Sequence, residues 1–275
     1  MDCAGKILDV NKACVMGVLN ITTDSFSDGG QYIQPQHAVE RAMQMVKEGA
    51  AIIDIGGEST RPGAEAVHIE DELNRVIPVI EALAGAKIPV PISIDTSKPE
   101  VMTAAIKAGA GMINDVSALQ EPGALDVVKQ AGVPVCLMHM KGDPRTMQSD
   151  PQYEDVVRDI KGFLEQRVQA CVDAGISRNK LILDPGFGFG KTLEQNLVLL
   201  KHLDEFQSLK LPVLVGISRK SMIGNLLGTD VGERKQGSVA AAVIAAWQGA
   251  KIIRAHDVRE TVDALKICEA VQAVN

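Results

Sequence analysis

Acidic and amide side chains stand at the ends of short apolar runs, where they could bind a ligand. Asp184 ends the run LILD and is followed by Pro-Gly-Phe-Gly-Phe-Gly, while Asp95 and Asn114 end two earlier runs. Two carboxylates and an amide at one pocket floor would accept N–H bonds from a flat amino-pyrimidinone ring, at about 1.5–3 kcal/mol per charge-assisted bond. The same residues also fit catalytic carboxylates, magnesium ligands, or side chains that hold caps and turns.

Basic side chains cluster late in the sequence, in the segments SRKS (residues 218–221) and IRAHD (residues 253–257). Arg254 and His256 share one side of an extended segment, because side chains alternate along a strand. The helix expected to begin near Asp257 would add backbone N–H donors for an anion. In a chain with a formal net charge of −7, this convergence favours a local anion site. Solvated positions at a pocket rim are the alternative for Lys220 and His256.

Residues 185–192 imitate a nucleotide-binding loop without its spacing. They end in Gly-Lys-Thr, as a P-loop does, but Pro185 stands where the first glycine should be. We therefore disfavour nucleotide binding and interpret Phe187 and Phe189 as walls for a planar ring or as core residues. His139 could be a metal ligand or a general base. Because no second histidine lies at ligand spacing, we favour a hydrogen-bonded residue at a strand end.

Composition and charge exclude several classes of function. Hydrophobic residues make up 46% of the 275 residues, enough for a sizeable core, and the negative charge argues against a nucleic-acid or anionic-membrane binder. The five cysteines include no C-x-x-C, so neither a disulfide framework nor a zinc site is indicated. The N-terminal residues lack the apolar core of a signal peptide, and no apolar run approaches the ~18–20 residues of a membrane span. We expect a soluble cytoplasmic protein.

Short, mostly continuous apolar runs alternate with helical patterns along the chain. Such runs are typical of parallel strands buried on both faces, and those expected are residues 15–19, 51–55, 91–94, 112–114, 133–138, 181–184, 213–217 and 252–254. About eight strand–helix units predict a (β/α)8 TIM barrel, whose C-terminal strand ends face one mouth. A doubly wound open sheet is the alternative. We expect a single domain over residues 1–275, with a core of about 14–272.

Helix signals and long connections complete the sequence-based picture. An apolar stripe predicts a helix over residues 69–83, and the longest helix is expected within residues 151–174. Cap signals open three more helices, at Ser97 with Glu100, Thr192 with Gln195, and Asp257 with Glu260. The connections at residues 21–34 and 56–68 are long and rich in Gly, Ser, Thr and Asp, as functional lids usually are.

With these residues assembled, the chain resembles the bacterial dihydropteroate synthases, a family of pterin-binding barrels. The resemblance runs from Val15 to about Ala270 through the blocks MGVLNITTDSFSDGG, IIDIGGESTRPGA, ISIDTSKPEV, INDVSAL, CLMHMKGDP, LILDPGFGFGKT, LVGISRKSMIG and IIRAHDV. It implies a transferase of folate biosynthesis that condenses 6-hydroxymethyl-7,8-dihydropterin diphosphate with 4-aminobenzoate, giving 7,8-dihydropteroate and pyrophosphate. It further implies Mg2+, inhibition by sulfonamides, and a homodimer built on the late helices.

The resemblance also assigns roles to individual residues. The pterin diphosphate would be bound by Thr60, Asp95, Asn114, Asp184, Lys220, Arg254 and His256, of which the last two hold the diphosphate. Asn20 would contact the magnesium ion. The aminobenzoate pocket would be framed by Phe26, Arg61, Pro62, Phe189, Lys220 and Ser221. The residues expected to act in catalysis are Asp184, Lys220, Arg254, His256 and, facing a developing cation from the first loop, Asp28.

The implied chemistry needs no strong base. The amine of aminobenzoate is already neutral at neutral pH, so the demanding step is loss of diphosphate, and we expect an SN1-like displacement. Thr23 stands where the family usually has proline, which puts the stiffness of the first loop in doubt. Two alternatives share the floor of Asp95, Asn114 and Asp184. They are a methyltetrahydrofolate-dependent methyltransferase, which would not need the cationic loops, and a non-catalytic pterin-binding protein.

Overall fold

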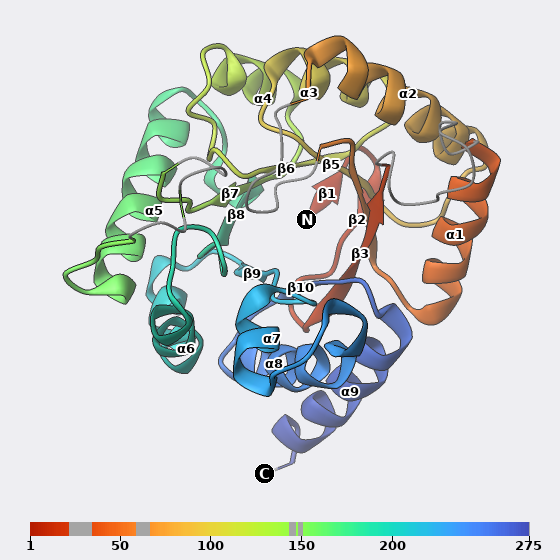
Figure 1. Cartoon of the computed structure of the whole chain (residues 1–275). Helices are drawn as coiled ribbons and strands as arrows, with labels where there is room; N and C mark the ends of the chain where they lie inside the picture. The colour runs from red at the N-terminus through yellow and green to blue at the C-terminus, as the bar shows by residue number, and fades with distance from the viewer. Residues whose placement is uncertain (22–34, 59–66, 143–146, 148–150, 275) are drawn as a thin grey trace.

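The structure, a computed structural model, describes residues 1–21, 35–58, 67–142, 147 and 151–274. Eight parallel strands in this part of the chain form a barrel, with helices around its outside (Figure 1). They run in the order β8-β7-β6-β5-β4-β3-β10-β9, and a parallel bridge between Leu183 and Val213 joins the two ends. The predicted (β/α)8 barrel is therefore confirmed, and the open-sheet alternative is wrong.

The barrel strands begin and end close to the predicted positions. They are β3 (Cys14–Asn20), β4 (Ile52–Gly56), β5 (Ile92–Asp95), β6 (Met112–Asp115), β7 (Val135–Met138), β8 (Leu181–Asp184), β9 (Leu214–Val215) and β10 (Ile252–Ala255). The largest difference is in β9, where five predicted residues become two. Val213 lies outside this strand, where it forms the bridge that closes the barrel and accepts from the N–H groups of Lys251 and Ile252.

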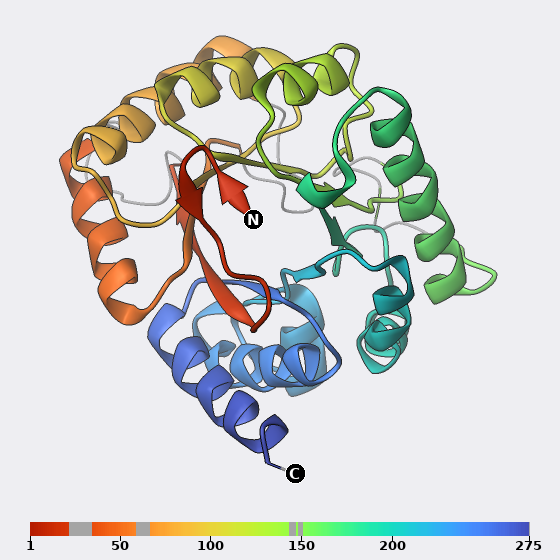
Figure 2. The same ribbon diagram turned by 180° about the vertical axis from the view of Figure 1, so that it is seen from behind.

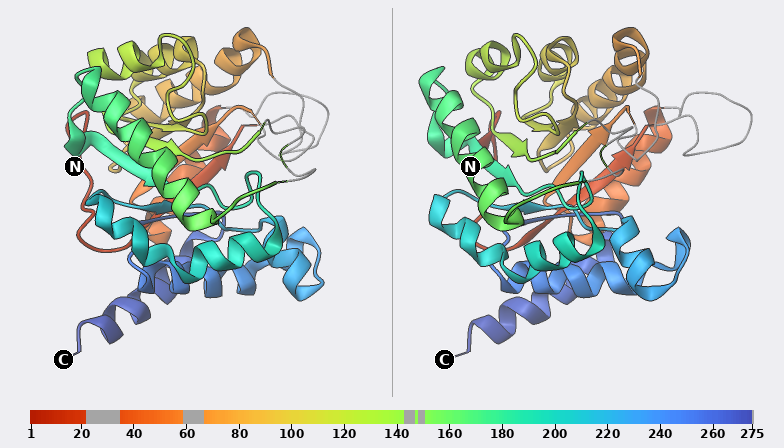
Figure 3. Two further views of the ribbon diagram at one scale, coloured as in Figure 1. Left: turned by 90° about the vertical axis from the view of Figure 1, so that its left-hand side faces the viewer. Right: turned by 60° about the vertical axis from the view of Figure 1, so that its left-hand side comes forward.

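The helices run antiparallel to the strands and cover their outer faces. They are α1 (Pro35–Glu48), α2 (Ile69–Gly85), α3 (Pro99–Ala108), α4 (Ala124–Ala131), α5 (Val156–Asp173), α6 (Leu193–Lys201), α7 (Ser221–Leu227), α8 (Lys235–Trp247) and α9 (Val258–Gln272), with short 3-10 helices η1 (Arg178–Lys180), η2 (Leu203–Leu209) and η3 (Val231–Glu233). As predicted, α5 is the longest of them. Figure 3 shows α9 carrying the C-terminus away from the barrel. None of these helices in the described chain combines the length and apolarity needed to cross a membrane.

The predicted start of α6 is confirmed, but that of α3 is wrong. Thr192 accepts from the Gln195 N–H and the Gln195 side chain accepts from the Thr192 N–H, which is a complete capping box. In contrast, α3 begins at Pro99, with Lys98 at the N-cap position and no capping side chain. Proline suits the first helical position because its missing N–H would have no helical partner there. Ser97 therefore lies one residue too early to cap this helix.

The start of α9 is predicted at the right residue, but its side chains act differently. Asp257 is the N-cap residue, yet its carboxylate makes no capping bond and binds Arg219 instead. Glu260 pairs with Lys235. The stripe predicted for α2 is buried along most of its length, but its first residue, Ile69, is 38% exposed. Its neighbours at that end are acidic, so the stripe reaches the barrel only further along the helix.

The lower interior of the barrel is a closed apolar layer. One side chain from each of seven strands contributes to it, namely Met16, Ile52, Met112, Cys136, Ile182, Leu214 and Ile252. Cys3 and Leu8 complete the layer from an N-terminal hairpin, β1 (Asp2–Cys3) and β2 (Lys6–Ile7). Figure 2 shows this N-terminal segment lying across the end of the barrel. Because this end is plugged, a ligand can approach the interior only from the C-terminal ends of the strands.

Candidate active site

Polar side chains form the next layer of the barrel interior. Each member of this polar layer lies two residues after a residue of the apolar layer on the same strand. On β5, the buried Ser93 takes the place of the apolar residue. The polar residues are Asp54, Asp95, Asn114, Asp184 and Arg254. Side chains two residues apart on a strand point to the same face, so all five point inward at the C-terminal ends of the strands. The alternation of inward and outward side chains along each strand therefore produces an apolar layer in the lower barrel and a polar layer, the floor of the site, above it.

Arg254 lies between two carboxylates of this floor. Its Nε donates to Asp54 Oδ2 at 2.6 Å and its Nη2 donates to Asp95 Oδ2 at 2.7 Å. The Asn114 amide also donates to Asp54 Oδ2, at 3.3 Å. Within the described residues, the second oxygen of the fully buried Asp54 has no hydrogen-bond partner. Arg254, which the sequence analysis assigns to an anion site, thus lies in the same layer as the acids of the floor.

Burial and pairing set the charges of these groups. Burial acts to lower the pKa of Arg254, but Asp54 and Asp95 outweigh it and raise the pKa, so the guanidinium stays charged. Burial raises the pKa of Asp95 to about 7, against the opposing effect of Arg254. Burial therefore makes Asp95 easier to protonate than an ordinary aspartate, while its ion pair with Arg254 favours the carboxylate.

Asn114 and its neighbour Asp115, at the end of β6, have different roles. Asp115 holds the following turn, because its carboxylate accepts from the N–H groups of Ser117 and Leu119 at 2.8 and 2.7 Å. Asn114 points into the barrel and contacts Asp54. The alternative in which Asn114 merely holds a turn is therefore wrong.

Asp184 and Lys220 form the other half of the floor. Asp184 is buried, and its Oδ1 accepts from the Gly186 N–H at 2.7 Å, so one oxygen does hold a turn. Burial raises the pKa of Asp184, while the nearby Lys220 opposes this rise. Burial also lowers the pKa of Lys220 to about 8, and Asp184 limits that fall. Each group thus favours the charged form of the other.

The turn after β8 surrounds the end of the Lys220 side chain. The Lys220 ammonium donates to the Phe187 carbonyl and lies 4.3 Å from the centre of the Phe189 ring. Phe187 itself is completely buried in the main core, so it is a core residue rather than a wall. Phe189 is also largely buried but faces Lys220. Gly186 is required because its φ is +71° and a Cβ atom there would collide with the His139 carbonyl.

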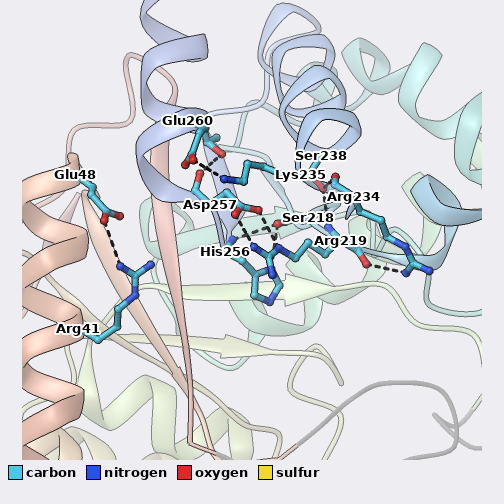
Figure 4. A network of polar contacts seen from close by, with 11 residues as sticks. Arg41, Glu48, Ser218, Arg219, Arg234, Lys235, Ser238, His256, Asp257 and Glu260 are labelled. Carbon is cyan, nitrogen blue, oxygen red and sulfur yellow. Dashed lines mark hydrogen bonds and ion pairs between the residues drawn. The ribbon is translucent and has the colours of Figure 1, made fainter. Parts of the chain in front are cut away.

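The loops after β9 and β10 are fastened to each other by Arg219 (Figure 4). Its Nε and Nη2 donate to the two oxygens of Asp257 at 2.9 and 2.6 Å. Its backbone N–H donates to Ser238 Oγ at 2.9 Å, and its carbonyl accepts from Arg234 Nη1 at 3.1 Å. Arg219 therefore uses its charge to hold the two loops together. The neighbouring Lys220 points the other way, into the barrel.

His256 lies beside the same pair of loops. Its Nδ1 is 3.0 Å from Ser218 Oγ, and its backbone N–H donates to that oxygen at 3.2 Å. Ser218 thus fixes the orientation of the imidazole ring. His256 directly precedes the N-cap residue of α9, Asp257, whose side chain makes no capping bond to the first turn of that helix. Arg254, His256 and an uncapped helix start form the kind of surface that binds phosphate groups.

His139 proves to be a buried hydrogen-bonded residue at the end of β7. Its Nδ1 lies 3.1 Å from Lys191 Nζ, and its ring packs edge-on against Phe163. Burial lowers the pKa of His139 to about 3, so the imidazole is neutral at neutral pH. The favoured interpretation, a hydrogen-bonded residue at a strand end, agrees with these contacts. The described part of the chain holds no cluster of three or more His, Cys, Asp or Glu residues suited to a metal.

Several predicted site residues fall outside the described part of the chain. They are Phe26, Asp28, Thr60, Arg61 and Pro62, together with the unusual Thr23. The ends of the second loop are described and are joined by Glu58, whose Oε1 accepts from the Val67 N–H at 2.9 Å. Lys98 donates to both Glu58 and the fully buried Glu72, at 2.6 Å each. Nothing in the sequence singled out this ionic cluster.

Asn20 and Ser221 also lie at the C-terminal end of the barrel. Asn20 is the last residue of β3, and Ser221 is the exposed first residue of α7. A Cβ atom placed on Gly56 would be 3.7 Å from both Asn20 Oδ1 and Asp95 Oδ2. These two oxygens therefore flank the same glycine at the floor. Amide and carboxylate oxygens are the protein ligands that Mg2+ prefers.

Comparison with known proteins gives one consistent family. A family model described as "Pterin binding enzyme" matches residues 16–256. The dihydropteroate synthase of Escherichia coli K12 is 55% identical over 266 residues, covering 97% of this chain and 94% of that protein. Identity at this level over nearly the whole of both chains shows a shared family and not a shared fold alone.

Solved structures agree. A Yersinia pestis dihydropteroate synthase in complex with a sulfonamide drug superimposes with a TM-score of 0.95 and 53% identity, covering 100% of both chains. The Xanthomonas albilineans enzyme in complex with 7,8-dihydropteroate gives a TM-score of 0.90 and 50% identity, covering 99% of this chain and 98% of that one. The same enzyme has been solved with 4-aminobenzoic acid, at a TM-score of 0.93, 53% identity and the same coverage.

Proposed function

This chain belongs to the pterin-binding enzyme family, and from that membership we propose the roles of the residues that line its site. Its reaction is that of a dihydropteroate synthase in folate biosynthesis, in which 6-hydroxymethyl-7,8-dihydropterin diphosphate condenses with 4-aminobenzoate. The methyltransferase and the non-catalytic binding protein are set aside. Relatives that are 50–55% identical over nearly the whole chain are synthases, and this chain has the cationic loops that a methyltransferase would not need.

The observation that carries the assignment of roles is the convergence of Asp95, Asp184, Lys220 and Arg254 in one layer of the barrel. We assign Asp95, Asn114 and Asp184 to the N–H donors of the pterin ring. Lys220 faces the ring from the Asp184 side. The oxygen of Asp54 that lacks a partner among the described residues supports a floor with spare acceptor capacity. We therefore add Asp54 to the floor as the residue that positions Arg254.

The diphosphate belongs on the cationic side of this layer. Arg254 and His256 bind it, Thr60 contributes from the second loop, and the uncapped start of α9 supplies backbone N–H groups. In the reaction the pterin C–O bond breaks and its electron pair leaves with the diphosphate, so these groups stabilise the departing charge. The pterin cation that remains is stabilised by Asp184 and Asp28. The neutral amine of aminobenzoate then forms the C–N bond and releases one proton.

A magnesium ion on the diphosphate is part of this proposal. The donor set fits it, because Asn20 offers an amide oxygen at the edge of the acidic floor and Mg2+ is often bound by one or two protein oxygens together with substrate phosphates. Asn20 is the residue that would hold it. When bound, the ion would neutralise charge on the leaving group.

The aminobenzoate pocket is proposed above the pterin site. Phe189 and Lys220 would form its inner wall and Ser221 its rim, with Phe26, Arg61 and Pro62 from the two long loops completing it. Sulfonamides would bind in the same place, as they resemble aminobenzoate in shape. The cation–π contact between Lys220 and Phe189 supports this arrangement, because it gives the wall a flat aromatic surface and a positive charge.

Phe26→Leu tests the aminobenzoate pocket. Losing the aromatic face should weaken binding of aminobenzoate and of a sulfonamide by roughly five- to tenfold, whereas the affinity for pterin diphosphate should stay within about twofold. Calorimetry with each ligand measures both. An equal loss for the two ligand types would contradict the placement of Phe26.

The pH dependence of kcat/KM for pterin diphosphate tests the floor. The pKa of Lys220 is lowered to about 8, so its ammonium is lost as pH rises through that value and binding of the anion weakens. The pKa of Asp95 is raised to about 7, so its carboxylate is protonated as pH falls through that value and N–H acceptance weakens. The profile should therefore be bell-shaped, with its maximum between the two values.

Lys220→Arg separates the two limbs of this profile. Arginine stays charged throughout the accessible range, so the alkaline limb should move up or vanish while the acid limb stays in place. Activity at the maximum is expected to fall, because arginine does not reproduce the shape of lysine. An alkaline limb that stays unchanged in this variant would show that Lys220 is not its source.

We further propose that the chain forms a homodimer through α8 and α9. These two helices pack against each other and expose large apolar side chains, Ile244 and Trp247 on α8 and Ile267 and Val271 on α9, with Trp247 exposed by 55%. Contiguous apolar surface of this kind usually marks an interface. Trp247→Glu should convert a dimer into a monomer in light scattering, while Met43→Glu, at an exposed apolar position on α1, should not. A wild-type monomer would contradict the proposal.

We propose a cytoplasmic location for the chain. All five cysteines are free, and four of them are buried, where oxidation would disturb the core. Free thiols persist most readily in a reducing compartment.

A further inference from the structure

Lys191 is a buried lysine beside the site whose role remains to be explained. Only 2% of it is exposed. Its Nζ lies 2.7 Å from the Gly186 carbonyl oxygen, 3.0 Å from the Phe189 carbonyl oxygen and 3.1 Å from His139 Nδ1. Two carbonyl oxygens and a ring nitrogen thus surround Nζ as possible acceptors, as many as the donors of an ammonium group. Lys191 thereby ties the loop after β8 to the loop after β7.

The same turn contacts Lys220 from its other side. The Phe187 carbonyl accepts from Lys220, and the Phe189 ring lies under the Lys220 ammonium. A Cβ atom on Gly188 would lie 3.2 Å from Lys220 Cδ, so the turn also touches the stem of that side chain. The turn thus contacts both lysines: its carbonyls bind Lys191, and the Phe187 carbonyl and the Phe189 ring contact Lys220 over the pterin floor.

We propose that Lys191 is a positioning residue for Lys220: its Nζ group fixes the carbonyls of the turn over residues 186–190, and this turn sets where the Lys220 ammonium lies over the floor. This inference rests on the proposed role of Lys220 in the pterin pocket. Without the three bonds, the carbonyls of Gly186 and Phe189 would have to find other donors. The turn would then rearrange, and the Phe187 carbonyl and the Phe189 ring would move with it.

The surroundings of Lys191 exclude two more direct roles. A P-loop lysine extends toward a phosphate, whereas Lys191 Nζ is enclosed by carbonyls of its own loop and by His139. A general base would need access to substrate, which its burial denies. The titratable groups that contact or act on it are His139, Asp184 and Lys220. Burial lowers the pKa of Lys191, and Asp184 opposes that effect.

Lys191→Met in the full chain is the first test, because methionine keeps the unbranched stem and removes all three donors. Affinity for pterin diphosphate, measured by calorimetry, should fall about tenfold. The decisive measurement is a double-mutant cycle with Lys220→Met. If Lys191 acts through Lys220, adding Lys191→Met to Lys220→Met should change the affinity by less than about twofold. A merely structural lysine would lower the melting temperature and leave binding by the folded protein unchanged.

Lys6→Met is the matched control. Lys6 is also a partly buried lysine that donates to a backbone carbonyl, that of Val90 at 2.9 Å, but it lies at the opposite end of the barrel. Pterin diphosphate affinity should be the same as in the unaltered chain. A comparable loss in Lys6→Met would mean that the effect of Lys191→Met is a general consequence of instability and would overturn the inference.

A pair of His139 variants covers the case in which Lys191→Met does not fold. His139→Gln keeps an acceptor for the Lys191 ammonium, whereas His139→Leu removes it. We expect His139→Leu to weaken pterin diphosphate binding by about three- to tenfold and His139→Gln to restore most of that loss. Equal affinities for the two variants would overturn the inference.

The proposed role of Lys220 and the inference about Lys191 would be contradicted by different results. If Lys220→Met alone binds pterin diphosphate as tightly as the unaltered chain, the proposed role of Lys220 is wrong and this inference falls with it. If Lys220→Met weakens binding but Lys191→Met does not, or if the two effects add in full, the role of Lys220 stands and only the inference about Lys191 is wrong.

Discussion

Arg254→Met is expected to lower kcat/KM for pterin diphosphate by about a thousandfold, since removing a single preorganised charge-stabilising donor typically lowers rates by about 10²–10³ and Arg254 contributes several. The same change should destabilise the fold. Arg254 bonds to Asp54 and Asp95, and removing one partner of a buried ion pair typically costs about 3–5 kcal/mol. Steady-state kinetics and chemical denaturation measure the two effects separately.

The control for this variant is Arg158→Met. Arg158 lies on α5 in exposed ion pairs with Glu154 and Asp159, and exposed pairs of this kind contribute about 0–1 kcal/mol. Its loss should leave both activity and stability nearly unchanged. Activity of Arg254→Met within tenfold of the unaltered chain would contradict the placement of the diphosphate.

Asp184→Asn is expected to weaken binding of pterin diphosphate by about a hundredfold, with little change in folding. The substitution keeps size and shape, and the amide oxygen of the new side chain can still accept from the Gly186 N–H. It removes the negative charge that we propose binds the ring and that favours the charged form of Lys220. Loss of two charge-assisted hydrogen bonds at roughly 1.5 kcal/mol each gives this magnitude. Calorimetry with pterin diphosphate in excess magnesium measures it.

The pH dependence distinguishes this explanation from a loss of shape. Asp184 limits the fall in the pKa of Lys220, which lies at about 8. Without that charge the pKa of Lys220 should drop further, so the alkaline limb of kcat/KM should move to lower pH in Asp184→Asn. Asp126→Asn, at an exposed position on α4, serves as the control. Unchanged affinity in Asp184→Asn would refute its role at the floor.

The barrel and the composition of its mouth were predictable because they depend on local pattern. Continuous apolar runs mark strands buried on both faces, and the period of two then places Asp95, Asn114, Asp184 and Arg254 on the inward side. The cap at Thr192 was predictable for the same reason, since both of its partners lie within four residues. In each of these cases, residues close together in the sequence were sufficient to predict the structure.

The pairings within the site were not predictable, because they join residues that are far apart in the sequence. Arg254 meets Asp54 from a distance of 200 residues and Asp95 from 159, and no local pattern indicates which carboxylates it would choose. Asp257 shows the same effect. Its sequence context is that of a helix cap, but Arg219, 38 residues earlier, offers a stronger charged partner.

Lys191 shows how a local motif can mislead. Gly-Lys-Thr suggests a phosphate loop, but the glycines of this segment serve close packing against the loop after β7, as a Cβ atom on Gly186 or Gly190 would collide with the carbonyls of His139 or Lys141. The lysine then binds the carbonyls that this packing brings together. The roles assigned to Phe26, Asp28, Thr60, Arg61 and Pro62 stay predictions, since they lie outside the described residues.

The most direct test of the account is a crystal structure of this chain with pterin diphosphate, magnesium and aminobenzoate bound. It should show the N–H groups of the pterin ring within hydrogen-bonding distance of Asp95 and Asp184, with diphosphate oxygens contacting Arg254 and His256. A ring bound outside the barrel mouth, or a diphosphate lying against Asp184 and away from Arg254, would contradict the account.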